Sequence, residues 1–372
     1  MKILQTPVRF RPFIGGVENY VYNLSRGLVR LGHEVTVLCA NEPKSEKEEL
    51  MDGIRVKRLP YIGKIANTNI TPSLPIEILR EDFDLIHAHL PTPWSADWSA
   101  VFSKMRRRPL ILTYHNDIVG AGFANRAAHL YNRTALKNLL NRADRIIITQ
   151  PKYLRSSPYL KRYEDKIVVI PVGVDVERFR PMRSEKINNS IFFLSVLDEF
   201  HRYKGLDQLL RALVLVKEEI SDARLIVGGD GHLLEHYRRL SEDLGLGENV
   251  DFLGRVPEEM LANYYNRCDI FVLPSVSKAQ EGFGMVLLEA MACGKPVVCT
   301  DIVGVADEVK TKGAGLIVEP SNAEELAEAI SHILQDRSLA HKMGEVGRRL
   351  VEERYGWEKV AKRVEEVYEG LI

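Results

Sequence analysis

The sequence has few cysteines and no excess of either charge. Its 372 residues include four cysteines (Cys39, Cys268, Cys293 and Cys299), and none of them forms a CxxC pair. Each lies among apolar residues, which predicts free buried thiols in a reducing compartment rather than a disulfide framework. Lysine plus arginine and aspartate plus glutamate number 51 each, so the chain has no global field that would favour nucleic acid.

Long hydrophobic runs and the common nucleotide-binding loops are also absent from the sequence. No run of about 18 apolar residues exists, so no membrane span is predicted. The first ten residues, MKILQTPVRF, lack the apolar core of a signal peptide, and a cytoplasmic protein is therefore expected. Without a Walker lysine pattern or a GxGxxG loop, P-loop enzymes and nicotinamide-dependent enzymes are disfavoured.

What the sequence does contain is an alternation of short β-rich runs and helical periodicity, which is typical of parallel sheets with crossover helices. A stretch at 177–190, rich in charge, interrupts the alternation and predicts an interdomain linker. We therefore expect an α/β protein with domains at 1–180 and 190–354. The predicted strands are 2–5, 34–39, 54–59, 85–87, 110–114, 145–149, 167–170, 191–195, 224–227, 250–253, 270–273, 296–299 and 316–318.

The most informative stretch is 280–300, which reads QEGFGMVLLEAMACGKPVVCT. Its pattern predicts a glycine loop, a helix that ends at Gly294, and a buried strand. A helix that begins beside Gly284 presents free N–H groups to a phosphate. Glu281 and Glu289 lie on either side of that site. Two carboxylates beside a phosphate site suit a ligand that has a diphosphate between two sugars, which is a nucleotide sugar. The alternative is a common turn with two solvated glutamates.

Other candidate residues lie where predicted parallel strands end, which is the edge at which open α/β sheets bind ligands. Gly15 and Gly16 lie between a strand and a helix, although a plain tight turn is the alternative. Lys204 precedes a helix and could place its ammonium on a phosphate. His115 ends a strand and could donate to a sugar hydroxyl or phosphate, or serve as a structural histidine.

Two further patterns each have a plainer structural alternative. His87 and His89 alternate like strand residues and lack a nearby third ligand, so no metal site is expected. Trp94 and Trp98 recur on a predicted helix that ends in a basic cluster at 104–108. Such a stripe can dock on an anionic membrane, but a helix packed on its sheet with a solvated basic end is favoured.

The ordered set of motifs resembles one family over nearly the whole chain. The chain is similar to the retaining, nucleotide-sugar-dependent glycosyltransferases of the GT-B fold with an E-x7-E signature, which include mannosyltransferases, sucrose synthases and bacillithiol-pathway glycosyltransferases. The matching segments are GGVENYVYNLSRGLVRLGHEVTV from Gly15, DLIHAH from Asp84, TYHNDI from Thr113, VIPVGVDVERF from Val169, YKGLDQLL from Tyr203, VGGDG from Val227, NVDFLGRV from Asn249 and EGFGMVLLEAMACGKPVV from Glu281.

The resemblance implies two Rossmann-like doubly wound domains that face each other across a cleft. The C-terminal domain would bind the donor and the N-terminal domain the acceptor, with a final helix at 355–372 returning to the N-terminal domain. Among catalytic residues, it implies that His115 faces the transferred sugar, that Lys204 neutralises the diphosphate, and that Glu281 holds sugar hydroxyls.

The same resemblance implies roles for residues that bind the two substrates. On the donor side they are Gly16, Gly284, Met285, Glu289 and Val256, and on the acceptor side Gly15, Asn116 and Asp117. One departure stands out, because many relatives carry a glycine-arginine pair where this chain has Ser195-Val196. We hypothesise that Arg202 supplies the missing charge.

The predicted activity is transfer of a hexosyl group, with retention, from a UDP- or GDP-sugar to a glycan, lipid-linked or small-molecule acceptor. No cofactor and no metal are expected, since the chain supplies its own cations. A peripheral contact with the cytoplasmic face of the membrane is a further expectation, and nucleic acid is not. The alternatives are a sugar-nucleotide epimerase on the same fold and a non-catalytic nucleotide-sugar-binding protein.

Overall fold

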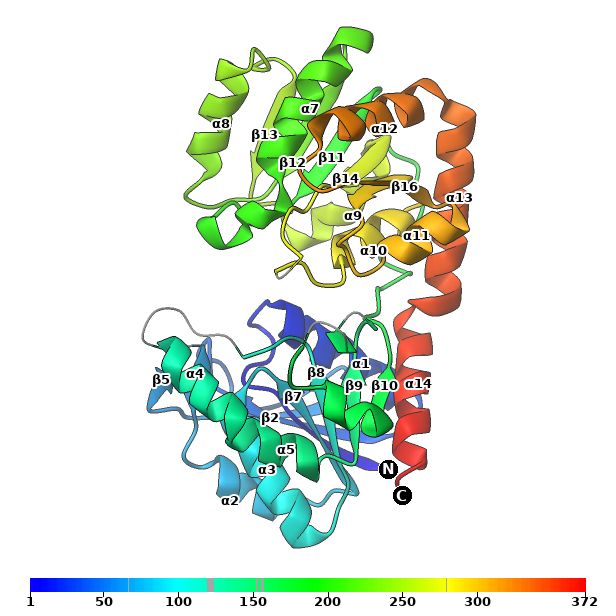
Figure 1. Cartoon of the computed structure of the whole chain (residues 1–372). Coiled ribbons are helices and arrows are strands. Elements are labelled where there is room, and N and C mark those ends of the chain that lie inside the picture. The colour runs from blue at the N-terminus through cyan, green and yellow to red at the C-terminus, as the bar shows by residue number, and fades with distance from the viewer. Residues whose placement is uncertain (66, 119–123, 152, 155–156, 279) are drawn as a thin grey trace. The chain divides into compact units, whose positions relative to one another are not determined.

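The computed structural model describes residues 1–65, 67–118, 124–151, 153–154, 157–278 and 280–372. The chain divides into two compact units, each with its own sheet (Figure 1). Unit 1 contains Met1–Gly173 and Trp357–Ile372, and unit 2 contains Val174–Gly356. No helix in the described part of the chain combines the length and the apolar content needed to cross a membrane.

Unit 1 is built on an eight-stranded sheet with the order β10-β9-β8-β7-β1-β2-β4-β3. Neighbouring strands are parallel except β3 and β4. A separate antiparallel pair, β5–β6, follows β4 in the chain. The strands are β1 (Lys2–Thr6), β2 (Glu34–Ala40), β3 (Glu48–Met51), β4 (Ile54–Leu59), β5 (Gly63–Ile65), β6 (Thr68–Ile70), β7 (Leu85–Leu90), β8 (Leu110–Tyr114), β9 (Arg145–Ile148) and β10 (Ile167–Val169).

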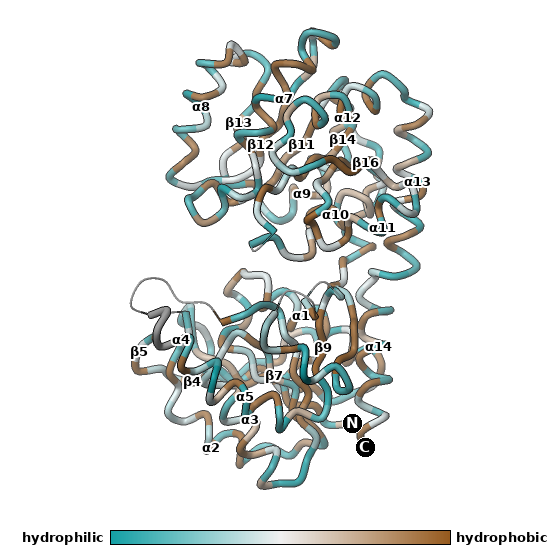
Figure 2. The backbone as a smooth tube through the Cα atoms, in the orientation of Figure 1, coloured by the Kyte–Doolittle hydropathy of each residue, from teal (hydrophilic) through white to brown (hydrophobic). Residues whose placement is uncertain are grey.

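Helices cover this sheet because each has one apolar face. In α1 (Gly16–Arg30), Val21, Leu24 and Leu28 are fully buried at steps of three and four. Figure 2 shows the resulting mixture of hydrophobic and hydrophilic residues along the helices. The other helices of unit 1 are α2 (Leu74–Arg80), α3 (Pro93–Arg106), α4 (Ala124–Arg133), α5 (Ala135–Arg142), the 3-10 helix η1 (Lys161–Lys166) and α14 (Trp357–Glu369).

The last helix, α14, completes unit 1 although it comes from the far end of the sequence. It packs against α1 (Figure 1), and Val360, Val364 and Tyr368 are fully buried. The long apolar stripe of the final helix therefore covers the N-terminal unit. Gly173 is required by this packing, because a Cβ atom there would lie 2.6 Å from the Trp357 ring.

Unit 2 is built on a six-stranded parallel sheet with the order β13-β12-β11-β14-β15-β16. The strands are β11 (Ser190–Leu194), β12 (Arg224–Gly228), β13 (Val250–Gly254), β14 (Ile270–Leu273), β15 (Val297–Thr300) and β16 (Gly315–Val318). The helices are η2 (Glu199–Lys204), α7 (Leu206–Glu219), α8 (Leu234–Asp243), η3 (Glu258–Met260), α9 (Leu261–Arg267), α10 (Met285–Ala292), α11 (Ala306–Lys312), α12 (Ala323–Gln335) and α13 (Arg337–Arg354).

The segment predicted as a linker is partly packed. Residues 174–180 belong to unit 2, whereas the sequence placed them in the first domain. Phe179 is buried with its ring centroid 5.8 Å from that of Tyr265, and Arg348 donates hydrogen bonds to the carbonyls of Val176 and Phe179. These contacts place the division between the units at Gly173.

Candidate active site

Lys204 and Glu281 meet at the carboxyl edge of the unit 2 sheet. Lys204 follows β11 and Glu281 follows β14, and these two strands are adjacent. They also mark the switch point of the sheet, from which the chain proceeds outward in opposite directions, and such points bind ligands in open α/β sheets. The Lys204 ammonium lies 3.0 and 2.9 Å from the two Glu281 carboxylate oxygens.

The Glu281 carboxylate is saturated with donors. Besides Lys204, it accepts a hydrogen bond from the Ser275 hydroxyl and one from the Gly282 N–H at 3.0 Å. Its side chain is 1% exposed, whereas that of Lys204 is 18% exposed. Because three groups donate four hydrogen bonds to its oxygens, Glu281 is poorly suited to act as a nucleophile. The Lys204 side chain remains partly exposed, so its ammonium group can also bind an anion.

The α10 N-terminus lies on the same loop as Glu281. Gly284 caps it in the left-handed region at φ 85°, a conformation that glycine adopts without steric cost. Gly284 is also tightly enclosed, since a Cβ atom there would lie 2.5 Å from Val303 Cγ1. Met285 is the first helical residue, so the first turn of the helix presents N–H groups without intrahelical partners.

Glu289 lies one turn into α10 and accepts a hydrogen bond from the Tyr265 hydroxyl at 2.8 Å. Its side chain is partly accessible, but the carboxyl group is surrounded by protein. Burial raises the pKa of Glu289 to about 7, against the opposing effects of the Tyr265 hydroxyl and the Arg178 charge. Glu289 therefore changes its charge near neutral pH.

The Arg202 hypothesis gains no support from the geometry. Arg202 lies on η2 with an exposed side chain, and it interacts with the Tyr237 hydroxyl of α8. No contact of Arg202 with Lys204 or Glu281 is found among the described residues. Val256, the residue predicted to border the base, is half-buried just beyond the end of β13.

The two predicted glycines of unit 1 differ in their surroundings. Gly15 caps α1, and a Cβ atom there would lie 2.3 Å from Glu18 Oε2. Gly16 is exposed, and a Cβ atom there would have no neighbour within 4 Å. A side chain at Gly15 would therefore crowd the Glu18 carboxylate, whereas the Gly16 position is open to a ligand.

An ion-pair cluster fixes the loop that carries these glycines, and the sequence reasoning missed it. Arg9, 8% exposed, lies 3.3 Å from the Glu18 carboxylate and 3.7 Å from that of Glu42. It also donates to Asn67 Oδ1 at 3.0 Å. The available signal was a charged residue three positions after the first strand, together with Glu18 in the first helical turn.

The acceptor-side residues that follow β8 have divergent environments. Asn116 is exposed. Asp117 accepts hydrogen bonds from the Tyr114 hydroxyl at 2.5 Å and the Ser157 hydroxyl at 2.7 Å. Its carboxylate is therefore held by two protein hydroxyls. His115 is half-buried, its backbone N–H donates to the Leu90 carbonyl, and its Nε2 lies 3.4 Å from His89 Nδ1.

The aromatic stripe of α3 packs on the sheet, as the favoured alternative predicted. Trp94 and Trp98 are partly buried and pack against the core beneath α3, and the Trp94 indole N–H donates to the Thr71 carbonyl at 3.1 Å. Arg106 donates to the carbonyls of Leu79 and Glu81. These two tryptophans therefore do not supply a membrane-facing surface.

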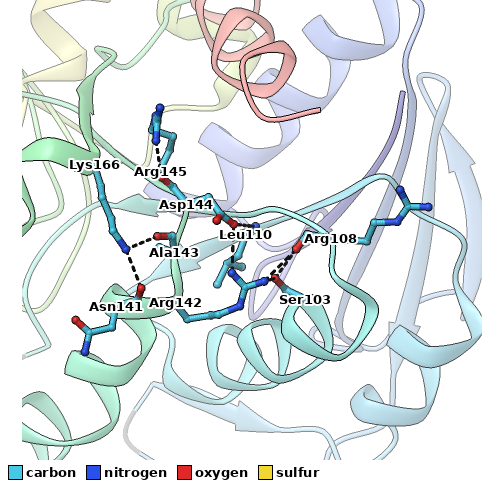
Figure 3. Close-up of polar contacts among 9 residues, drawn as sticks. All are labelled: Ser103, Arg108, Leu110, Asn141, Arg142, Ala143, Asp144, Arg145 and Lys166. Atoms are coloured by element: carbon cyan, nitrogen blue, oxygen red, sulfur yellow. Dashed lines mark hydrogen bonds and ion pairs between the residues drawn. The ribbon is translucent and has the colours of Figure 1, made fainter.

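A neighbouring group of cations at the amino edge of this sheet is likewise engaged with protein carbonyls (Figure 3). Arg142 donates to the Ser103 hydroxyl at 2.7 Å and to the Arg108 carbonyl at 3.2 Å. Lys166 donates to the carbonyls of Asn141 and Ala143 at 2.7 and 2.8 Å. These contacts satisfy the carbonyl ends of α3 and α5, which is a structural role.

No group of three or more histidine, cysteine, aspartate or glutamate residues is placed to hold a metal ion within the part of the chain that the structure describes. All four cysteines are buried, and the structure shows no disulfide among them. Burial raises the pKa of Cys39, Cys268 and Cys293 to about 12, so these thiols stay protonated at neutral pH.

Two family profiles match the chain in succession. "Glycosyltransferase Family 4" matches residues 14–178 and "Glycosyl transferases group 1" matches residues 178–350. The chain belongs to the GT-B glycosyltransferases. The order of the two matches follows the order of the two units, and the chain's two parallel α/β sheets agree with this family's fold.

Relatives of this glycosyltransferase span its whole length. An Escherichia coli protein, O-antigen chain mannosyltransferase C, is 29% identical over 95% of this chain and 94% of its own. A GDP-mannose-dependent alpha-(1-6)-phosphatidylinositol monomannoside mannosyltransferase of Mycolicibacterium smegmatis is 27% identical over 97% and 96%.

Solved structures agree with the fold. Sucrose-phosphate synthase of Thermosynechococcus elongatus superposes with a TM-score of 0.74 at 25% identity and covers 100% of this chain and 99% of its own. HepE of Anabaena, solved in complex with UDP, has a TM-score of 0.78 at 21% identity and covers 100% of both chains.

Proposed function

We propose that this glycosyltransferase moves a hexosyl group, with retention of anomeric configuration, from a UDP- or GDP-sugar to a glycan, lipid-linked or small-molecule acceptor. The observation that carries the proposal is the Lys204–Glu281 pair beside the α10 N-terminus, at the switch point of the unit 2 sheet. The relatives named for mannosyl transfer, one of them GDP-mannose-dependent, make GDP-mannose the first donor to test.

The proposed mechanism depends on charge at the leaving diphosphate. As the bond between the sugar and the β-phosphate oxygen breaks, the negative charge on that oxygen grows. The Lys204 ammonium and the N–H groups at Gly284 and Met285 stabilise it. The same oxygen takes the proton of the acceptor hydroxyl, whose oxygen bonds to the anomeric carbon on the face that the diphosphate leaves. No metal and no enzyme nucleophile enters this scheme.

The remaining residues receive roles that follow the family resemblance. Glu281 orients Lys204 rather than holding sugar hydroxyls itself, because both of its oxygens already accept hydrogen bonds from protein groups. Glu289 accepts from the ribose hydroxyls, and Val256 borders the base. From the same resemblance we propose that the Gly16 backbone contacts the donor diphosphate or the acceptor, and that His115 contacts the transferred sugar. We propose that Gly15, Asn116 and Asp117 lie beside the bound acceptor. Asp117 acts mainly by holding the loop that follows β8.

Donor turnover followed by NMR tests this function against its alternatives. With donor alone, a transferase gives only slow hydrolysis to free sugar and nucleoside diphosphate. Addition of a pool of cell-derived glycans or lipid-linked oligosaccharides should accelerate donor loss, and the new anomeric signal should share the donor's configuration. A new nucleotide sugar formed without acceptor would identify an epimerase, and binding without any turnover would identify a non-catalytic protein.

Donor affinity should depend on pH through Glu289. Ribose hydroxyls donate more strongly to a carboxylate than to a carboxylic acid, so the ionised form binds the donor better. With its pKa raised to about 7, Glu289 loses its proton as pH rises. Calorimetry should show donor affinity rising about tenfold from pH 6 to pH 8. Glu289→Gln should flatten this dependence, and a flat profile in the unaltered protein would contradict the role.

A surface on α2 and α3 supports the proposal that the acceptor is lipid-linked and lies at the cytoplasmic face of the membrane. These two helices contact each other, and Arg80 and Lys104 are exposed beside their apolar side chains. Basic residues flanking exposed apolar groups suit an anionic lipid surface. The apolar side chains, with their exposed fractions, are Ile76 (52%), Leu79 (42%), Val101 (50%) and Met105 (57%).

Sedimentation with lipid vesicles tests this surface. We expect binding to vesicles that contain phosphatidylglycerol at low salt, and little binding to pure phosphatidylcholine. Exchanging both Val101 and Met105 for glutamate should weaken binding about tenfold, because two apolar contacts are lost. Leu50→Glu, on β3 at the far end of the sheet and 76% exposed, is the matched control. Equal binding by both variants would exclude this surface.

A further inference from the structure

Unit 1 holds three stacked histidines beneath its carboxyl edge. The ring centroids of His87 and His89 are 4.6 Å apart, and those of His89 and His115 are 5.6 Å apart. Burial lowers the pKa of His87 and of His115 to about 3, and that of His89 well below its usual value. All three rings are therefore neutral at physiological pH, and each has one N–H and one bare nitrogen.

A hydrogen bond from Gln5 determines which nitrogen of His89 is protonated. Gln5 on β1 is fully buried, and its Oε1 lies 2.8 Å from His89 Nε2. A carbonyl oxygen only accepts, so Nε2 of His89 carries the proton and Nδ1 is bare. His115 Nε2, 3.4 Å from that bare nitrogen, must then be the donor. This leaves Nδ1 of His115 with its lone pair.

The Gln5 amide is also connected to a second set of contacts. Gln5 also interacts with the Tyr368 hydroxyl of α14, although its Nε2 does not reach hydrogen-bond geometry. The Tyr368 oxygen lies 2.6 Å from His87 Nδ1, and His87 Nε2 lies 2.7 Å from Thr113 Oγ1. With the amide nitrogen toward Tyr368, the hydroxyl donates to His87, and His87 donates to Thr113. If the amide were reversed, each of these groups would exchange its role as hydrogen-bond donor or acceptor.

We propose that Gln5 and His89 are positioning residues that hold His115 as the Nε2–H tautomer, so that its Nδ1 accepts a hydrogen bond from a hydroxyl of the transferred sugar. The catalytic part of this inference rests on the proposed function. It differs from the sequence expectation, in which His115 donates to a sugar hydroxyl or a phosphate, because a nitrogen without a proton can only accept. The contacts of His115 recorded within the described residues agree, since its ring hydrogen bonds only through Nε2.

Long-range proton–nitrogen NMR of protein labelled with ¹⁵N-histidine reads this tautomer directly. The chain has ten histidines, and the spectrum of His115→Gln identifies the signals of His115. In the unaltered protein, Nε2 of His115 should show the shift of a protonated nitrogen and Nδ1 that of a bare one. Gln5→Met keeps the side-chain volume but removes the acceptor, so His115 should then sample both tautomers.

Two further variants complete the design. Gln5→Glu retains an acceptor and should keep the Nε2–H form of His115. Ser99→Ala removes a buried hydrogen bond to Thr6 without touching the stack, and it controls for a general loss of packing. In transfer assays, Gln5→Met should lower kcat about tenfold, the equivalent of one lost hydrogen bond, while Ser99→Ala should not.

An Nδ1–H tautomer in the unaltered protein, or an unchanged His115 spectrum in Gln5→Met, would overturn the inference. The spectra need no substrate. If no nucleotide sugar were turned over, the proposed function would fail, while the NMR result would still decide whether Gln5 sets the tautomer.

Discussion

Lys204→Ala should reduce kcat/KM for the nucleotide-sugar donor by about 10² to 10³, the size expected when one group that stabilises a developing anion is removed. Lys204 supplies a full positive charge beside the α10 N-terminus, at the point where the leaving diphosphate is proposed to lie. Steady-state kinetics with saturating acceptor measures the effect. Lys217→Ala, which removes a lysine of α7 bonded only to the Gly245 carbonyl among the described contacts, should leave kcat/KM unchanged.

Loss of stability must be separated from loss of catalysis in this variant. Without Lys204, the Glu281 carboxylate stays buried with only Ser275 and Gly282 as donors, which should cost about 1–3 kcal/mol of stability. Combining Lys204→Met with Glu281→Gln removes both charges and should recover most of that stability. If activity returned with stability, Lys204 would be structural and its catalytic role would be wrong.

The second large effect is expected at the glycine that begins α10. Gly284→Ala introduces a Cβ atom in the left-handed region and 2.5 Å from Val303 Cγ1. Strain and overpacking together should destabilise the protein by about 2–5 kcal/mol. The loop must also shift, so donor affinity should fall at least about tenfold as the N–H groups lose their alignment. Denaturant unfolding and calorimetry measure the two effects.

A matched glycine controls for the backbone strain. Gly313 caps the end of α11 at φ 76°, and a Cβ atom there would have no neighbour within 4 Å. Gly313→Ala should therefore cost only about 1–2 kcal/mol and leave donor affinity unchanged. Adding Val303→Ala to Gly284→Ala should recover part of the stability. Equal costs for the two glycine variants would mean that the contact with Val303 has no energetic consequence.

The sequence was sufficient to predict the α/β class and the main strands, because period-2 and period-3.6 patterns are local. It also placed Lys204 and Glu281 in loops after strands. Their direct ion pair spans 77 residues of sequence, and only the strand order puts their two loops side by side. The E-x7-E spacing could not reveal that the Glu281 carboxylate already accepts four hydrogen bonds from three protein groups.

Features that depend on long-range packing escaped the sequence reasoning. The β5–β6 pair and α2 were not among the elements that the sequence predicted. The link between Tyr368 and His87 joins residues 281 positions apart. Trp94 and Trp98 could be assigned to the core only once α3 was placed on its sheet, since an aromatic stripe looks the same on a packed helix and on a membrane-facing one.

The central claim is that the Lys204–Glu281 edge of unit 2 binds a nucleoside diphosphate sugar. The most direct measurement is the thermal unfolding midpoint with GDP-mannose, UDP-glucose and ADP-glucose, with pyrophosphate and sulfate as anion controls. At about 100 times Kd, a specific donor should add about 2.7 kcal/mol of stability and raise the midpoint by several degrees. That shift should disappear in Lys204→Ala. No shift with any nucleotide sugar, or an equal shift with the simple anions, would contradict the account.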